Sequence, residues 1–297
     1  MNMRLKYPKV GVIGAGVMGR ALAQTLAQSG HVAVLVDVSE LILEDARREI
    51  ARALKLAGLF DRAPRVADPG SILERLVTTT DYGKLVDVDF VVENTTEDWA
   101  TKESVYRTLE RTCPPRCVLA ANTSAIPIAR IAAVMSDPTR VIGMHFMNPV
   151  PRKSIVEVIR GRATSDVAVG AARELLSEMG KRMILVRDSP GFVTNRVLML
   201  TINEAIAVVQ EGVAGPAEVD EIFVGCFAHA MGPLATADLI GLDTILRSLE
   251  VLRESFGNPK FDPSPLLVEM VGSGRLGRKS GVGFFNYHSG GKAVGHS

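Results

Sequence analysis

The sequence predicts an α/β fold in which a doubly wound, mostly parallel sheet is followed by an all-helical C-terminal domain. Short apolar segments typical of buried strands alternate with helical patterns through the first two thirds of the chain. This order builds a parallel sheet covered by helices. Long helical patterns dominate after a polar segment at Arg187–Gly191. We therefore expect one domain over residues 1–188 and a second over residues 189–297.

The individual elements follow from the spacing of apolar residues and from the residues that begin or end helices. A polar stretch with two prolines at residues 61–69 breaks one helix, and residues 72–76 fit either a brief helix or a strand. Strands are expected from Lys9 to the first glycine of the turn described below and at residues 32–36, 77–80, 90–93, 118–121, 141–146, 155–159 and 183–186. Helices are expected at residues 17–29, 41–59, 98–112, 126–135, 167–179, 193–210, 217–224 and 244–256.

A glycine turn between the first strand and the first helix indicates a dinucleotide site. Gly14, Gly16 and Gly19 have the spacing G-x-G-x-x-G. The first permits a tight turn, the second lets the backbone approach a pyrophosphate, and the third lets the helix pack close to its strand. Free N–H groups at the start of the helix, at Val17 and Met18, then face the phosphates. These five residues are the predicted phosphate-binding turn.

The acid that ends the second strand favours NAD over NADP. Asp37 can hydrogen-bond both hydroxyls of an adenosine ribose and would repel a 2′-phosphate. A second copy of the glycine spacing, at residues 272–277, follows an apparent helix at residues 266–271, and no strand ending in an acid comes after it. We interpret the second copy as a loop. For the first copy, at Gly14–Gly19, the minor alternative is a glycine turn that binds no ligand.

Composition indicates an ordinary globular protein. The 297 residues are 47% hydrophobic and 23% charged, and the net charge of +1 does not indicate a nucleic-acid or anionic-membrane partner. The longest apolar runs are too short to span a bilayer, and the first residues lack the apolar core of a signal peptide. Cys113, Cys117 and Cys226 do not make a disulfide framework, and no metal site is expected. We expect a reduced, soluble, cytoplasmic protein.

Four polar residues near strand ends or the domain junction are candidates for chemistry. Each has a simpler interpretation: Ser124 could cap a helix starting at Ile126, and His145 could be a core residue. Asn195 could be a polar residue that only faces solvent. Glu157 is harder to explain so simply, because it lies between valines, where a carboxylate without a partner is costly to bury. Together the four supply a base, a carboxylate to orient it, and two neutral hydrogen-bonding groups for a substrate oxygen.

A series of motifs in one order makes the chain resemble the L-3-hydroxyacyl-CoA dehydrogenase family, and in particular its bacterial 3-hydroxybutyryl-CoA dehydrogenase branch. The resemblance runs from Val10 to Tyr287. Its motifs are Gly-Ala-Gly-Val-Met-Gly at 14–19, Asn-Thr-Ser at 122–124, His-Phe-Met-Asn-Pro-Val-Pro at 145–151, Val-Glu-Val at 156–158, Pro-Gly-Phe-Val-Thr-Asn-Arg at 190–196, Met-Gly-Pro-Leu at 231–234 and Gly-Leu-Asp at 241–243.

This resemblance implies a Rossmann half, a helical half that dimerises, and a hydride transfer between NAD and the C3 position of a short 3-hydroxyacyl thioester. It implies that His145 is the general base in oxidation and the acid in reduction, with Glu157 holding its imidazole. Ser124 and Asn195 would hydrogen-bond the reacting oxygen. The remaining positions that match cofactor contacts are Asp37, Glu97, Lys102, Asn122, Asn148 and Lys279.

The identity of the acyl carrier stays open between coenzyme A and an acyl carrier protein. The segment Gly58–Pro69 and its approach offer mainly Lys55, Arg62 and Arg65, fewer basic residues than the coenzyme A-clasping segment of fatty-acid-degrading relatives. Residues 231–244 resemble a biosynthetic branch that oxidises hydroxyacyl groups on a carrier protein for polyketide extender units. Arg152 and Lys153 are candidates for meeting such an acidic carrier.

Two further alternatives and the oligomeric state complete the expectations. Hydroxyacid dehydrogenases of the 6-phosphogluconate type use a Lys where this chain has Asn195-Arg196, and they lack the His–Glu pair. An NAD-binding protein without activity would not need all four polar residues. We expect a homodimer formed through the helical domain, because that domain is rich in apolar residues for its size. Examples are Ile222, Phe223, Phe227, Leu234, Leu239 and Ile240.

Overall fold

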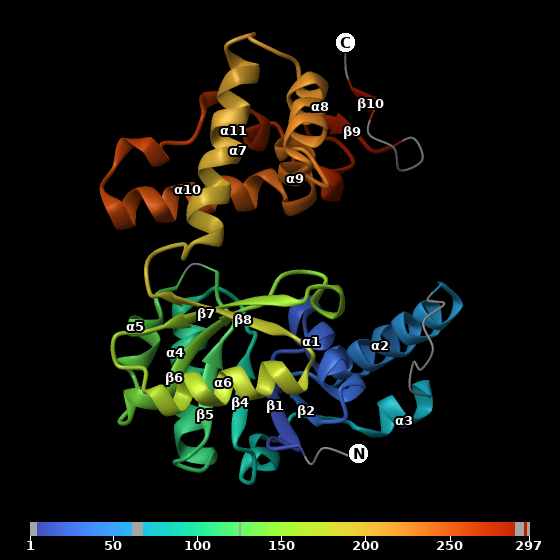
Figure 1. Ribbon diagram of the computed structural model, residues 1–297, viewed down its shortest axis with the longest axis vertical. Coiled ribbons are helices and arrows are strands. Elements are labelled where there is room, and N and C mark those ends of the chain that lie inside the picture. The colour runs from blue at the N-terminus through green and yellow to red at the C-terminus, as the bar shows by residue number, and fades with distance from the viewer. Residues whose placement is uncertain (1–4, 61–67, 125, 289–293, 296–297) are drawn as a thin grey trace. The chain divides into compact units, whose positions relative to one another are not determined.

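Figure 1 shows the computed structural model of the chain, which describes residues 5–60, 68–124, 126–288 and 294–295. The chain forms two compact units, Met1–Ser189 and Pro190–Ser297, and each is described here by itself. The division falls within the polar segment at Arg187–Gly191. Arg62 and Arg65 lie outside the described residues.

The N-terminal unit is built on one eight-stranded sheet, which confirms the predicted fold class. The strand order is β3-β2-β1-β4-β5-β6-β7-β8, and every neighbouring pair is parallel except β6 and β7, which are antiparallel. The strands are β1 (Lys9–Ile13), β2 (Val32–Val36), β3 (Leu76–Thr79), β4 (Phe90–Glu93), β5 (Val118–Ala121), β6 (Val141–His145), β7 (Ile155–Arg160) and β8 (Arg182–Arg187).

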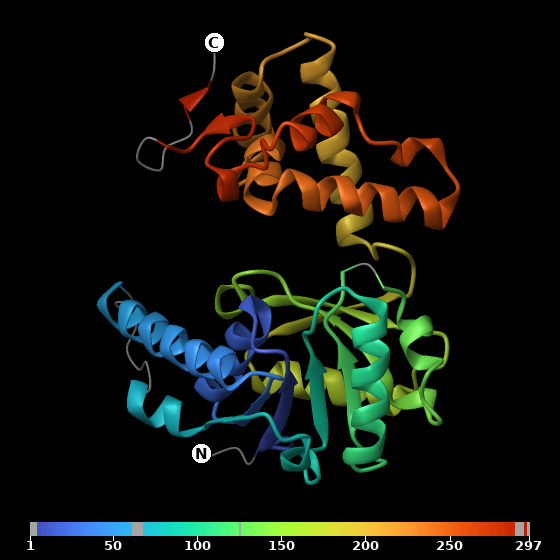
Figure 2. The same ribbon diagram turned by 180° about the vertical axis from the view of Figure 1, so that it is seen from behind.

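Helices cover both faces of this sheet, as the two opposite views in Figures 1 and 2 show. One face packs against α1 (Val17–Gln28), α2 (Glu40–Phe60) and α6 (Asp166–Glu178), with Leu22 and Leu175 fully buried against strand residues such as Val12. The other face is covered by α4 (Trp99–Thr112) and α5 (Ile128–Ala132). Alternate strand residues therefore face two apolar layers, which explains why the strands are apolar almost throughout.

Several helices and turns in this unit differ from the expectation. Residues 72–76 divide between the end of α3 (Pro69–Glu74) and the start of β3, and a 3-10 turn, η1 (Tyr82–Leu85), was not predicted. The helix expected at residues 126–135 is only the five residues of α5, because Pro127 precedes it and its continuation is irregular. Short 3-10 segments also lie at η2 (Pro138–Arg140) and η3 (Val150–Arg152).

The C-terminal unit is helical, as predicted, and has its own apolar core. Its elements are α7 (Thr194–Gln210), α8 (Pro216–Phe227), α9 (Pro233–Ile240), α10 (Leu242–Phe256), η4 (Pro259–Phe261), α11 (Pro265–Gly272), η5 (Arg278–Ser280) and the short strands β9 (Phe285–Asn286) and β10 (Val294–Gly295). Helix α9 was not predicted. Its Leu234, expected on a dimer surface, is fully buried in the unit's core beside Ile202 and Leu249. The second glycine motif follows α11 as a turn and loop, as predicted.

Two buried aspartates organise this helical core. Asp220 accepts hydrogen bonds from the backbone N–H groups of Leu234 and Ala235, both at 2.8 Å, and so caps the start of α9. Asp238 accepts from the N–H groups of Phe284 and Phe285 and from the phenol of Tyr287. These bonds tie the segment after α11 to α9.

Over the described residues, none of the helices is long and apolar enough to cross a membrane. Within the same ranges, no group of three or more His, Cys, Asp or Glu side chains is placed to hold a metal ion. Cys113, Cys117 and Cys226 are free thiols.

Candidate functional site

The candidate site lies where the parallel strands of the N-terminal unit end. Strands β1, β4, β5 and β6 run in one direction, so their carboxyl ends reach the same edge of the sheet. Ligands of such sheets bind at this edge. The structure places the glycine turn after β1, Asn122–Ser124 after β5 and His145 at the end of β6.

His145 and Glu157 form a hydrogen-bonded pair. They lie directly opposite each other in the antiparallel pair β6–β7, and His145 Nδ1 is 3.1 Å from Glu157 Oε2. Both residues are buried, 7% and 8% exposed. A carboxylate that accepts a hydrogen bond from Nδ1 selects the imidazole tautomer with its proton on Nδ1, in which Nε2 is the nitrogen able to accept a proton.

Ser124 is held by Glu97 rather than serving as a helix cap. The Glu97 carboxylate accepts from the Ser124 backbone N–H at 2.6 Å, from the Ser124 hydroxyl at 3.2 Å and from the Thr123 hydroxyl at 2.7 Å. Helix α5 begins at Ile128 with Pro127 before it, and the oxygen that meets the Ile126 N–H is that of Thr123. The capping interpretation of Ser124 is therefore wrong, because the helix starts later than expected.

Asn122 uses both ends of its side-chain amide within the protein. Its Nδ2 donates to Asn94 Oδ1 at 2.7 Å, and its Oδ1 accepts from the Phe146 backbone N–H at 3.0 Å. Asn94, which sequence reasoning did not identify, follows β4 and joins this group across the strand ends. The sequence signal that could have identified Asn94 was the run of polar residues that begins at the end of β4.

Lys102, matched to a cofactor position, has its ammonium inside the protein. It is fully buried, and its Nζ lies 2.9 Å from both carboxylate oxygens of Glu93. Glu93 Oε1 also accepts from the N–H and hydroxyl of Thr95. Burial, with the nearby Glu93 carboxylate, raises the pKa of the Tyr106 phenol. Glu93 was missed by sequence reasoning, although an acid ending an apolar strand nine residues before a lysine was a usable signal.

The glycine turn has the geometry that a pyrophosphate requires. Gly14 has φ +90°, and a Cβ there would lie 2.8 Å from the Asn94 carbonyl oxygen. A Cβ at Gly19 would lie 1.7 Å from the Gly14 carbonyl oxygen, so only glycine permits this contact of α1 with the turn. Around Gly16 the Cβ position is open, with nothing within 4 Å, and no side chain caps the start of α1. Exposed backbone with uncapped N–H groups is a phosphate cradle.

Asp37 lies beside this turn. One of its carboxylate oxygens accepts from the Ala15 N–H at 2.7 Å, which ties the end of β2 to the turn after β1. Val17 and Met18 form the first residues of α1, and Val17 is exposed. The uncapped N–H groups at the start of α1, the open space at Gly16 and the Asp37 carboxylate are the features that a dinucleotide-binding turn requires.

A cavity of 640 Å³ opens beside Asn148, three residues beyond His145. It lies between α1, α2 and η3, and Arg20 and Arg152 are the cationic residues that line it within the described ranges. The lining is otherwise largely apolar or uncharged, with Glu49 as its acid.

Asn195 and Lys279 belong to the C-terminal unit. Asn195 is the second residue of α7, and its backbone N–H donates to the Gly191 carbonyl oxygen at 3.0 Å. Lys279 lies in η5 and forms an ion pair with Asp243. Their meeting with the residues of the N-terminal unit stays a prediction.

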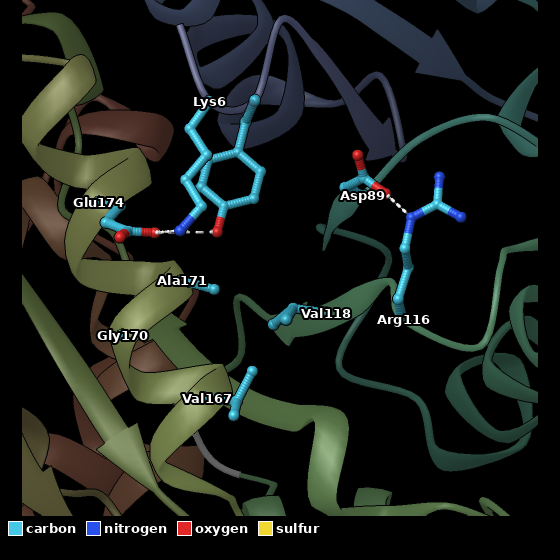
Figure 3. Close-up of a pocket in the computed structure, with 9 residues that line it drawn as sticks. Lys6, Asp89, Arg116, Val118, Val167, Gly170, Ala171 and Glu174 are labelled. Carbon is cyan, nitrogen blue, oxygen red and sulfur yellow. Dashed lines mark hydrogen bonds and ion pairs between the residues drawn. The ribbon is translucent and has the colours of Figure 1, made fainter.

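A separate cavity of 420 Å³ lies at the amino ends of the strands (Figure 3). Its charged lining residues pair with one another, Lys6 with Glu174 at 2.6 Å and Arg116 with Asp89 at 2.5 Å. Because these charges compensate each other, the lining does not point to an ionic ligand.

Comparison with known proteins identifies the family of both units. Residues 9–189 match the family model described as 3-hydroxyacyl-CoA dehydrogenase, NAD binding domain, and residues 191–287 match the one described as its C-terminal domain. The chain is 44% identical to a probable 3-hydroxybutyryl-CoA dehydrogenase of Bacillus subtilis over 95% of this chain and 98% of the relative. It is 40% identical to a 3-hydroxybutyryl-CoA dehydrogenase of Clostridioides difficile over 94% of this chain and 99% of that relative.

Solved structures agree with this result. The crystal structure of an (S)-3-hydroxybutyryl-CoA dehydrogenase from Ralstonia eutropha superposes with a TM-score of 0.91 and 41% identity, covering 96% of this chain and all of that one. The chain belongs to the NAD-dependent 3-hydroxyacyl-CoA dehydrogenase family.

Proposed function

We propose that the chain interconverts a short 3-hydroxyacyl thioester and its 3-keto form with NAD as the redox partner. The observation that carries this proposal is the His145–Glu157 pair, at the edge of the sheet that also holds the glycine turn and Asp37. NAD, when bound, supplies the acceptor for the hydride that leaves C3, or the hydride donor in the reverse direction. Gly14, Gly16 and Gly19 would accommodate its pyrophosphate, and Asp37 its adenosine ribose.

The proposed role of His145 is to move the hydroxyl proton. In oxidation, Nε2 takes the proton from the C3 hydroxyl while Nδ1 keeps its proton toward Glu157. The imidazolium that forms is then stabilised by the Glu157 carboxylate. In reduction, the same Nε2 returns the proton to the oxygen. Ser124 and Asn195 are proposed to hydrogen-bond that oxygen, with Glu97 holding the backbone of Ser124 in place.

The cavity beside Asn148 is a candidate binding site for the carrier portion of the thioester. We propose that the arm of the thioester runs through it, so that Arg20 and Arg152 face phosphate groups of the carrier. The relatives described above are named for coenzyme A thioesters, so coenzyme A is the proposed carrier. A carrier-protein thioester shares the phosphopantetheine phosphate and is the alternative outcome of the test.

One assay tests the reaction and the carrier together. NADH oxidation is measured with acetoacetyl-CoA, with the acetoacetyl thioester of N-acetylcysteamine, which has no phosphate, and with acetoacetyl-acyl carrier protein. We expect turnover of all three and the highest kcat/KM with the coenzyme A thioester. Absence of turnover with all three would contradict the proposed reaction, whereas a clear preference for the carrier protein would replace coenzyme A.

Arginine variants locate the carrier site. Arg152→Ala should lower kcat/KM for acetoacetyl-CoA by about tenfold, the size expected for a charge-assisted hydrogen bond, and should leave the N-acetylcysteamine thioester unaffected. Lys153→Ala is the matched control, because Lys153 is the adjacent cation but does not line the cavity. Equal losses with both thioesters would remove Arg152 from the phosphate site.

We also propose a homodimer formed by the C-terminal unit. Phe227 and Leu239 remain 64% and 53% exposed, and Ile222 is 50% exposed. Large apolar side chains exposed on one small helical unit are typical of a subunit interface.

A further inference from the structure

The backbone beside His145 is held by an asparagine side chain where strand pairing stops. Strands β5 and β6 pair through Ala121 and Gly143, and no later β5 residue pairs with β6 among the described residues. Beyond the paired residues, the Asn122 side chain holds the β6 side, since its Oδ1 accepts the Phe146 N–H at 3.0 Å. Asn122 thus extends the β5 side of the sheet to the residue that follows His145.

The other end of the same amide reaches the glycine turn through Asn94. Asn122 Nδ2 donates to Asn94 Oδ1, and Asn94 Nδ2 donates to the Val92 carbonyl oxygen at 2.9 Å. The Asn94 backbone N–H donates to the Ile13 carbonyl oxygen at 2.7 Å, one residue before Gly14. Because a Cβ at Gly14 would press on the Asn94 carbonyl, the turn and Asn94 are in close contact. One chain of contacts therefore runs across the ends of β1, β4, β5 and β6.

We propose that Asn122 is a positioning residue for His145, and that it acts by fixing the backbone at Phe146 rather than by contacting the cofactor. The inference deepens the proposed function, because it rests on the assignment of His145 as the group that moves the proton. His145 is held on one side by β7, through its register with Glu157, and on the other by Asn122 through Phe146. Fixing both sides limits rotation of the β6 end and keeps Nδ1 toward the Glu157 carboxylate.

Both ends of the Asn122 amide are required for this role. The acceptor end holds Phe146, and the donor end keeps the amide from rotating, since Asn94 Oδ1 can only accept. A small displacement of a reacting group is costly: an error of about 1 Å can reduce the rate about a hundredfold. Loss of Asn122 should therefore reduce kcat more than it weakens the binding of either substrate.

The direct test uses the protein without cofactor. Amide hydrogen exchange at Phe146 and the tautomer and titration of the His145 imidazole are followed by NMR in the unmodified chain and in Asn122→Ala. We expect Phe146 exchange to accelerate at least about tenfold relative to Met144, which remains within β6, because a protecting hydrogen bond is lost. We also expect the Nδ1-protonated fraction of His145 to fall. Unchanged exchange and an unchanged imidazole would overturn the proposal.

One variant separates the two ends of the Asn122 amide, and a variant of another asparagine is the control. Asn122→Asp keeps an acceptor for the Phe146 N–H but loses the donor to Asn94, so Phe146 should stay better protected than in Asn122→Ala. Asn258→Ala is the matched control: it removes an asparagine oxygen that accepts one backbone N–H, that of Lys260, in the C-terminal unit. The control should leave Phe146 and His145 unchanged. A shift in the control as large as in Asn122→Ala would contradict a specific effect.

Steady-state kinetics distinguish positioning from cofactor contact. In Asn122→Ala we expect kcat to fall about tenfold or more, KM for NADH to change less than about threefold, and the pH profile of kcat to shift. A raised KM for NADH with kcat kept at saturation would overturn the proposal in favour of a cofactor contact. Normal kcat in His145→Gln would refute the proposed function, whereas the exchange result at Phe146 tests the Asn122 clamp independently of turnover.

Discussion

Glu157 lies directly opposite His145 across the antiparallel pair β6–β7, and 3.1 Å separates its Oε2 from His145 Nδ1. This register places a carboxylate against the imidazole from a neighbouring strand, where the backbone of both residues is held by the sheet. The pair therefore depends little on side-chain flexibility, and the Nε2 nitrogen faces away from the carboxylate by the geometry of the ring.

Removal of either member of this pair should abolish most turnover without removing cofactor binding. We expect His145→Gln and Glu157→Gln each to lose at least about a hundredfold in kcat, the size typical of a general base or its orienting acid. NADH binding, followed by fluorescence titration, should persist. His31→Gln is the control, since His31 is also buried but bonds the Tyr7 carbonyl oxygen at the amino ends of β1 and β2, opposite the carboxyl ends that carry the site. Near-normal kcat in His145→Gln would refute the assignment.

Ser124 and Asn195 should act as a unit with His145. Ser124→Ala and Asn195→Ala should each lower kcat by no more than the His145 variant does, because each removes a neutral hydrogen bond to the same oxygen. Combining either with His145→Gln should add little further loss, since groups acting on one oxygen are not additive. Single and double variants are compared at saturating substrate. Fully multiplicative losses would show that the residues act independently.

Asp37 should determine the choice of cofactor. We expect a strong preference for NADH over NADPH in the unmodified chain, and Asp37→Ser should lower kcat/KM with NADH about tenfold or more while raising it with NADPH. Glu44→Ser, which changes an exposed acid on α2, should leave the ratio unchanged. Because Asp37 also accepts from Ala15, the melting temperature of the cofactor-free protein is measured alongside. Equal turnover of both cofactors by the unmodified chain would contradict the prediction.

Asp238 should make the helical unit more stable in acid. Burial raises the pKa of its carboxyl above the ordinary value of 3.8, even though three donors favour the charged form. The folded state therefore holds this proton more tightly than the unfolded state. Its stabilising contribution is present below about pH 4 and is lost as the pH rises through the folded pKa.

The difference in unfolding free energy between the unmodified chain and Asp238→Asn isolates this effect. Urea unfolding at a series of pH values should show the unmodified chain losing stability relative to the variant as the pH rises from about 3 toward neutrality. Asp98→Asn is the control of opposite sign, because hydrogen bonds from Thr101 lower the pKa of that exposed carboxyl. A difference that does not change with pH would contradict the prediction.

Phe227 should contribute to a dimer interface. Light scattering at micromolar concentration should show a dimer, and Phe227→Asp should shift it toward monomer, because a buried charge in an interface is costly. Val167→Asp is the control, since Val167 is an apolar residue of the N-terminal unit that is still more exposed, 79% against 64% for Phe227. A strictly monomeric unmodified chain would contradict the proposal.

Much of the fold was predictable because its signals are local. Strands β2, β4 and β5 have the predicted bounds, since each is a short, mostly apolar segment that is buried almost throughout. Helix α5 was overestimated because it begins only after Pro127, its N-cap, and because the residues after Ala132 form turns. Helix α9 was missed because its eight residues are too few to show a clear period, and its start depends on Asp220 from another helix.

The sequence by itself determined the order of strands and helices, the glycine turn and the set of polar residues near the strand ends, because these follow from neighbours along the chain. The pairing of His145 with Glu157 was predicted and is confirmed. Tertiary structure alone decided two other pairings, Lys102 with Glu93 and Asn122 with Asn94 and Phe146. The partners in these pairs are 9 to 28 residues apart. The pairings follow from strand register and from the burial of charge, which require each buried polar group to find whichever partner the packed elements bring within reach.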